Sequence, residues 1–216
     1  VSAALWLKKN TTEKDVIATH DVGAIGFYSG RKIVDVAGLV TPELINKIND
    51  ADYVKFMTKY LKDNKVTYLA FLREWYRVSN QTPAFTTVNT LPPEVMEVYK
   101  FNPETHILSR EANSLLMNAQ SLLRQKASPQ LKYVMNRVLE DEPNSSLAYY
   151  YLAFADFLDK NDVNYEKNML KAISLYPDFR DAQVRLGIFY KNLKRYNEAA
   201  VHLQRAIEIE PDNVEY

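Results

Sequence analysis

Polar side chains suited to acid–base chemistry or ligand binding lie in one short stretch near the amino terminus. His20 and Asp21 directly follow an apolar run over residues 16–18, and Asp35 lies in a second apolar run over residues 33–36. The carboxyl ends of neighbouring parallel strands are where α/β sheets place their sites. An imidazole and two carboxylates there could bind a polar ligand or act as an acid–base pair. The alternative is structural, with Asp21 capping a following helix and His20 as a satisfied hydrogen-bonding group.

The segment between the two apolar runs determines how these side chains would be placed. It is short and rich in small residues, and Ser29 and Gly30 close it. This pattern predicts a strand, a tight turn, a short helix and a second strand, which is a compact βαβ unit with parallel strands. The spacing of Gly23, Gly26 and Gly30 matches neither the dinucleotide fingerprint nor a P-loop. We therefore expect these glycines to serve tight turns and close helix–strand contact.

The rest of the first half continues the same pattern. Helices are predicted over residues 2–9 and 51–63, with a further helix start at 41–43. Strands are predicted over 16–20, 33–36, 66–72, 85–88 and 95–101, and the last of these alternates as an edge or antiparallel strand does. We interpret residues 1–105 as a small, mainly parallel α/β domain, and residues 102–111 as the junction.

Residues 110–216 form a repeat array. The interval from Pro143 to Pro177 equals that from Pro177 to Pro211, and both match the tetratricopeptide period of about 34 residues. The last unit matches best and has Leu186 and Gly187 where tetratricopeptide repeats usually have leucine and glycine. The middle unit differs, because it has Asp156 and Tyr165 where tyrosine and alanine are usual. We predict about three units, 112–145, 146–179 and 180–213, and expect 212–216 to begin another. The predicted helices cover 110–125, 128–141, 146–158, 163–175, 180–192 and 196–209.

In tetratricopeptide arrays the first helix of each pair lines the concave face. The predicted face is apolar and aromatic in its middle, which suits an extended peptide or a helix as a protein partner. It lacks the Lys/Arg clusters of arrays that clamp a carboxylate terminus. The alternative is that the α/β domain or a neighbouring repeat covers it. The candidate groove residues are Leu116, Gln120, Leu123, Tyr150, Phe154, Phe157, Ile188, Lys191 and Asn192.

Composition removes several classes of function. The chain of 216 residues has no cysteine, which excludes disulfides, zinc thiolate sites and thiol catalysis. His20, His106 and His202 are far apart in the sequence, so we predict no metal site and no cofactor. The 27 basic and 27 acidic residues argue against nucleic acid as a partner. No run of apolar residues is long enough to span a membrane. Because the chain starts at Val1 and stops within a repeat, we expect it to be a piece of a longer protein.

A longer pattern resembles a known family. It consists of Trp6 and Leu7, the run DVIATHDVGAIGFYSGR over residues 15–31, and the run VDVAGLVTPE over residues 34–43. Over roughly residues 1–75 the chain resembles the soluble domain that follows the transmembrane region of bacterial GT-C glycosyltransferases, relatives of protein mannosyltransferases and lipid A aminoarabinose transferases. The resemblance implies a parent enzyme that uses a polyprenyl-phosphate sugar donor. It also implies that the catalytic acid lies in an early loop outside this chain, so this chain itself is expected to be non-catalytic.

These observations leave three hypotheses. In the first, the chain is the extracytoplasmic C-terminal region of a bacterial membrane glycosyltransferase, and its repeats recruit a protein acceptor or assembly partner. In the second, it is a soluble, cytoplasmic tetratricopeptide adaptor with the α/β domain as a structural platform. In the third, it is a small-molecule enzyme that works through His20, Asp21 and Asp35.

Overall fold

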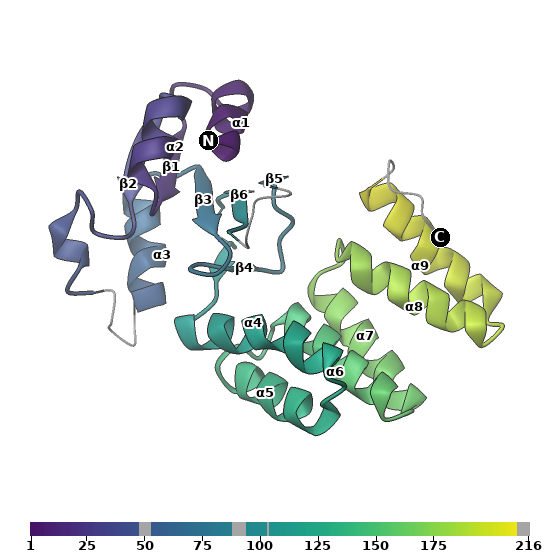
Figure 1. The fold of residues 1–216 in the computed structure, drawn as a ribbon. Coiled ribbons are helices and arrows are strands. Elements are labelled where there is room, and N and C mark those ends of the chain that lie inside the picture. Colours follow the sequence, from purple (N-terminus) through teal and green to yellow (C-terminus); the bar gives the residue numbers. More distant parts are fainter. Residues whose placement is uncertain (48–52, 88–93, 103, 211–216) are drawn as a thin grey trace. The chain divides into compact units, whose positions relative to one another are not determined.

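The computed structural model describes residues 1–47, 53–87, 94–102 and 104–210 (Figure 1). The chain divides into two compact units, Val1–Asn113 and Ser114–Tyr216. The division falls inside α4 (Arg110–Arg124), so one helix belongs to both units.

The first unit is built on a small sheet. Its strand order is β2-β1-β3-β6-β5, with β1 parallel to both β2 and β3. Strand β6 is antiparallel to β3 and to β5. The elements are α1 (Ser2–Asn10), β1 (Val16–Thr19), α2 (Val22–Ser29), β2 (Lys32–Asp35), the 3₁₀ helix η1 (Pro42–Leu44), α3 (Tyr53–Asp63), β3 (Tyr68–Leu72), β4 (Val78–Ser79), β5 (Phe85–Thr86), β6 (Met96–Lys100) and β7 (His106–Ile107).

The sheet is therefore mixed, and the prediction of a mainly parallel sheet needs correction. A parallel neighbour requires a long crossover, usually through a helix. The described part of the connection from β3 to β6 contains no helix and holds only the two-residue strands β4 and β5. A separate two-stranded ribbon pairs β4 with β7, and the sequence did not predict it. The predicted strand ending at residue 88 and the predicted helix start at residue 51 extend beyond the described residues.

Both faces of the sheet are covered by helices. Alternate residues of β3 point to opposite faces, so Leu69 and Phe71 pack in one cluster with Met57 of α3. Ala70 and the neighbouring Ile17 of β1 belong to a second cluster that includes α1 and α2. This two-sided burial explains why β3 is apolar almost without interruption.

The second unit consists of helix pairs. Their bounds agree within one residue at each end with the helices predicted from the repeat period, and the predicted start of another repeat lies outside the described residues. The helices are α4 (Arg110–Arg124), α5 (Ser128–Asp141), α6 (Ser146–Leu158), α7 (Asp162–Leu175), α8 (Arg180–Asn192) and α9 (Tyr196–Ile209).

The turn within each pair has the same backbone conformation. Lys126, Lys160 and Lys194 lie at the same position of successive repeats and have φ of 54°, 58° and 62°. In each turn the next residue donates its N–H to a carbonyl five residues back, as Arg195 does to Tyr190 at 2.9 Å. Such a bond closes the end of the first helix. The period therefore reflects a repeated local structure.

Small residues allow the paired helices to approach closely. Ala119, Ala153 and Gly187 occupy equivalent positions, and the two alanines are fully buried. A Cβ on Gly187 would lie 2.7 Å from Cγ of Leu203 on α9. Gly187 thus sets the approach of α8 to α9.

Candidate functional site

Three aromatic residues of α6 differ in how far they are buried. The ring of Tyr150 is buried against Phe154 and Phe179, at centroid distances of 4.9 and 4.8 Å. Phe154 is half-buried, and Phe157 leaves 57% of its surface exposed. Tyr150 therefore supports this surface from below, and Phe154 and Phe157 form it.

The other predicted groove residues differ in their accessibility. Leu116 is only 2% exposed, so it belongs to the core and a partner cannot contact it. Leu123 is half-buried, and Ile188 is exposed. The polar members Gln120, Lys191 and Asn192 are exposed.

A basic side chain that the sequence analysis missed borders the aromatic residues. The guanidinium of Arg185 on α8 lies 5.5 Å from the ring centroid of Phe154 on α6. A cation over an aromatic face is attracted to it. This contact links the first helices of successive pairs and places a positive charge at the border of the surface.

Tyr165 stands where tetratricopeptide units usually have alanine. Its ring is buried, 4.6 Å from Phe189 and 5.8 Å from Phe157. Its hydroxyl donates to the carbonyl of Arg185 at 3.4 Å. Tyr165 therefore fills the space between successive repeats and holds Phe157 in place.

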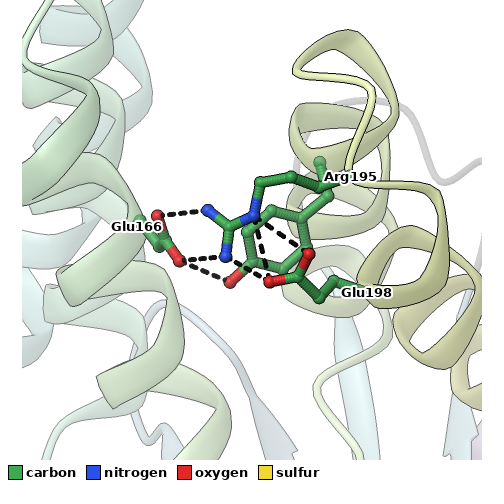
Figure 2. A network of polar contacts seen from close by, with 4 residues as sticks. Glu166, Arg195 and Glu198 are labelled. Carbon is green, nitrogen blue, oxygen red and sulfur yellow. Dashed lines mark hydrogen bonds and ion pairs between the residues drawn. The ribbon is translucent and has the colours of Figure 1, made fainter.

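Polar contacts connect α7 to the last pair (Figure 2). The guanidinium of Arg195 bonds to both oxygens of Glu166, at 3.0 and 3.1 Å, and pairs with Glu198. The Tyr190 hydroxyl donates to Glu166 at 2.8 Å, and Arg195 lies 4.2 Å over the Tyr190 ring. Hydrogen bonding from Arg195 lowers the pKa of Glu166. Burial raises the pKa of Tyr190 to about 12. The network fixes the relation of two successive repeats.

The polar residues at the carboxyl edge of the sheet have different local roles. Asp35 is buried and organises the loop that follows β2. One oxygen accepts from the amides of Ala37 and Gly38, and the other accepts from those of Val40 and Thr41, at 2.7 to 3.1 Å. Because four backbone amides donate to this carboxylate, Asp35 has a structural role in holding the loop.

Asp21 is the N-cap of α2. Its side chain accepts from the amide of Ala24 at 3.2 Å, which is the structural alternative that the sequence analysis named. Its charge also acts on His20.

His20 has no such partner. It is 6% exposed, and neither ring nitrogen has a hydrogen-bond partner among the described residues. Its ring lies 5.0 Å from that of Trp75 and 6.0 Å from that of Tyr76, both of which follow β3. Burial lowers the pKa of His20, and the nearby Asp21 carboxylate partly opposes this shift. Burial therefore disfavours the protonated imidazole, and no described residue uses the hydrogen-bonding capacity of His20.

Within the described ranges, no group of three or more His, Asp or Glu side chains is arranged to hold a metal ion. None of the helices described there is long and apolar enough to cross a membrane.

The comparisons with known proteins bear on both units. The model of a family described as "Domain of unknown function (DUF8728)" matches residues 1–187. The chain belongs to this family. The tetratricopeptide repeat model matches residues 181–213. The tetratricopeptide fold of the second unit rests on this match and on the turns that recur once in every repeat. No curated protein matches the chain.

Several solved structures are similar to about half of the chain. One is the first tetratricopeptide domain of Spaghetti (RPAP3) bound to the HSP90 peptide SRMEEVD, at 22% identity and a TM-score of 0.46, covering 50% of this chain and 85% of that one. The Sgt2 domain from Aspergillus fumigatus has 17% identity and a TM-score of 0.45, covering 49% and 70%. MamA has 21% identity and a TM-score of 0.42, covering 46% of this chain and 58% of MamA.

Proposed function

We propose that the second unit recognises a protein partner through the surface formed by Phe154, Phe157, Arg185, Ile188 and Lys191, which we term the first-helix face. The observation that carries this proposal is the exposure of Phe157, an aromatic side chain held in place by Tyr165 yet open to solvent. Aromatic anchors surrounded by polar residues are typical of recognition surfaces.

The chemistry of the first-helix face favours a particular kind of partner. Phe157 and Ile188 offer apolar contact, and Arg185 and Lys191 place two positive charges beside it. An extended peptide or a helix with apolar anchors and flanking acidic residues complements both features. The two similar domains of Spaghetti (RPAP3) are bound to the HSP90 peptide SRMEEVD, so tetratricopeptide domains include peptide binders.

A matched pair of variants tests the proposal. Peptides are first selected against the whole chain from a random display library, and their affinity is then measured by calorimetry. Phe157→Ala is expected to weaken binding by at least about tenfold, because an anchor residue contributes roughly 2 kcal/mol or more. Tyr133→Ala is the control, since Tyr133 is 69% exposed on α5 and is aromatic too. Equal losses in both variants, or none in Phe157→Ala, would refute the proposal.

We further infer a context for the first unit, on the strength of the resemblance over residues 1–75. The chain would be the extracytoplasmic region of a polyprenyl-phosphate-dependent membrane glycosyltransferase, with the repeats positioning its protein acceptor or assembly partner. Sequencing the reading frame upstream of Val1 tests this directly. Many hydrophobic spans with an acidic motif in the first outer loop are expected. An initiator methionine or a plain secretion signal directly before Val1 would refute the glycosyltransferase context and favour the soluble adaptor hypothesis.

A further inference from the structure

The order of the strands places a topological switch point at one edge of the sheet. From β1 the chain crosses through α2 to β2 on one side, and after α3 it reaches β3 on the other side of β1 (Figure 1). Where successive connections leave in opposite directions, a crevice opens at the carboxyl ends of the strands, and ligands of α/β proteins bind there. In this chain that switch point lies between the ends of β1 and β3.

The residues at this switch point are His20 after β1 and Trp75 after β3. The turn that bears Trp75 is anchored, because the amide of Trp75 donates to Leu72 and the Asn113 amide group donates to the carbonyls of Arg73 and Glu74. The Trp75 side chain is nevertheless 57% exposed, with one side against the His20 ring. An indole held by its backbone but open to solvent can turn aside about its side-chain bonds and leave His20 accessible.

His20 is costly for the fold as it stands. Burying a polar group without a hydrogen bond costs roughly 1–3 kcal/mol, and neither ring nitrogen of His20 is paired with any residue that the structure describes. An aromatic residue of similar shape would make the same ring contacts with Trp75 and Tyr76 without that cost. A buried group that is unsatisfied in this way requires an explanation beyond packing.

The charge beside His20 at the switch point indicates what would satisfy its ring nitrogens. The Asp21 carboxylate at the start of α2 would repel an anion, and it already occupies the amide of Ala24. An ammonium group could use only the acceptor nitrogen and would leave the imidazole N–H unpaired. A hydroxyl group can both donate and accept a hydrogen bond, so it can bond to either ring nitrogen of His20. The exposed indole adds a flat apolar surface beside these polar groups.

From this geometry we propose that the switch point, at His20 and Trp75, binds a neutral saccharide. A sugar hydroxyl bonds to a ring nitrogen of His20, and the C–H face of the sugar ring lies on Trp75. Gly23 in the first turn of α2 adds no side chain near this point, and a Cβ there would meet nothing within 4 Å. This site lies in the first unit and does not depend on peptide recognition by the repeats.

Fluorescence of Trp75 tests the proposal directly. The chain has two tryptophans, so Trp6→Phe leaves Trp75 as the sole indole reporter. This protein is titrated with glucose, mannose and N-acetylglucosamine at millimolar concentrations, with glycerol as a control that has hydroxyls but no ring. At least one sugar is expected to give a saturable change, and glycerol is not. Failure of all three sugars, or an equal response to glycerol, would overturn the proposal.

A second pair of variants tests the role assigned to His20. His20→Phe keeps a ring beside Trp75 but removes both nitrogens, so it is expected to weaken sugar binding by about tenfold, the equivalent of one hydrogen bond. His202→Phe, on α9 in the other unit, should bind as the parent does. If His20→Phe does not fold, the His20 ring resonances are followed by NMR instead. Sugar should shift them in the parent and not in Trp75→Leu, and shifts in neither protein would contradict the proposal.

Discussion

Lys132 and Asp156 join two successive repeats through an ion pair of 2.7 Å, with Asp156 buried. Glu166 and Tyr190 stand at the same two positions one repeat further along, and they are joined by a hydrogen bond of 2.8 Å. Asp156 stands where tetratricopeptide repeats usually have tyrosine, and the preceding repeat carries a lysine that pairs with it. One junction is built with an ion pair, and the next is built with a tyrosine and a carboxylate.

This equivalence predicts that the first junction can be converted into the second. Lys132→Glu alone should destabilise the chain by about 2 kcal/mol, because it removes the cation from a buried carboxylate and adds a like charge. Adding Asp156→Tyr should restore much of this loss by forming a Tyr–Glu hydrogen bond. A double-mutant cycle from urea unfolding should give a favourable coupling of about 1 kcal/mol. Additive effects would mean that the two junctions are not interchangeable.

The close approach of α8 and α9 predicts opposite effects of one substitution at two glycines. Gly187→Ala should lower the free energy of unfolding by about 1–3 kcal/mol, because the new methyl group would overlap Leu203. Gly23 lies in a helix and has open space around it, so Gly23→Ala should raise the free energy of unfolding by roughly 0.5–1 kcal/mol. Chemical denaturation of both variants provides the comparison. A stabilised Gly187→Ala would refute the account of this interface.

The left-handed turn residues offer a route to stabilisation. Lys160 has φ of 58°, a conformation in which a side chain is strained and glycine is not. Lys160→Gly should therefore raise the free energy of unfolding by about 0.5–1 kcal/mol, which is seen as a higher thermal midpoint. Lys167→Gly in the middle of α7 should lower stability by about 1 kcal/mol, since glycine costs most in a helix interior. If both changes destabilise the chain, the turn is not strained at Lys160.

The burial of His20 predicts a dependence of stability on pH. Its pKa in the fold lies below the ordinary 6.5, so the unfolded chain takes up a proton first as the pH falls. Stability should be fully present above pH 6.5 and should decline below it, until the pH reaches the folded-state pKa. Asp21 moderates the decline, because its charge favours the protonated ring.

The corresponding measurement is the free energy of unfolding as a function of pH for the parent and for His20→Phe. The variant should have a smaller slope just below pH 6.5. His202, whose pKa is also lowered by burial, contributes to both proteins and leaves a residual slope. Identical slopes would show that His20 is already protonated in the fold or does not titrate there.

The repeats could be predicted from the sequence because their signals are local. Each turn recurs once per repeat with the same hydrogen bonds, so the positions of Pro143, Pro177 and the small residue Gly187 fix the helix bounds. The pairs that join the repeats could not be predicted in the same way. Glu166 and Arg195 are distant in sequence, and neither residue type reveals its partner.

The sheet and the candidate sites show where local patterns are insufficient. β4 and β7 have two residues each, which is too short for any alternation to be visible. The direction of β6 depends on the connection that precedes it, and its composition does not encode this. Leu116 follows the repeat's groove spacing but is buried, because burial depends on what neighbouring helices cover. Asp21 was predicted as a helix cap or a functional acid, and its contact with Ala24 is that of a cap.

Amide hydrogen exchange of the whole chain with a display-selected peptide tests most directly whether a partner binds the first-helix face. The peptide is expected to slow exchange in α6 and α8 around Phe157 and Ile188, and to leave α5 around Tyr133 unchanged. Phe157→Ala is expected to abolish this protection. Protection confined to the second helices of the pairs, or to the first unit, would show that the partner binds elsewhere.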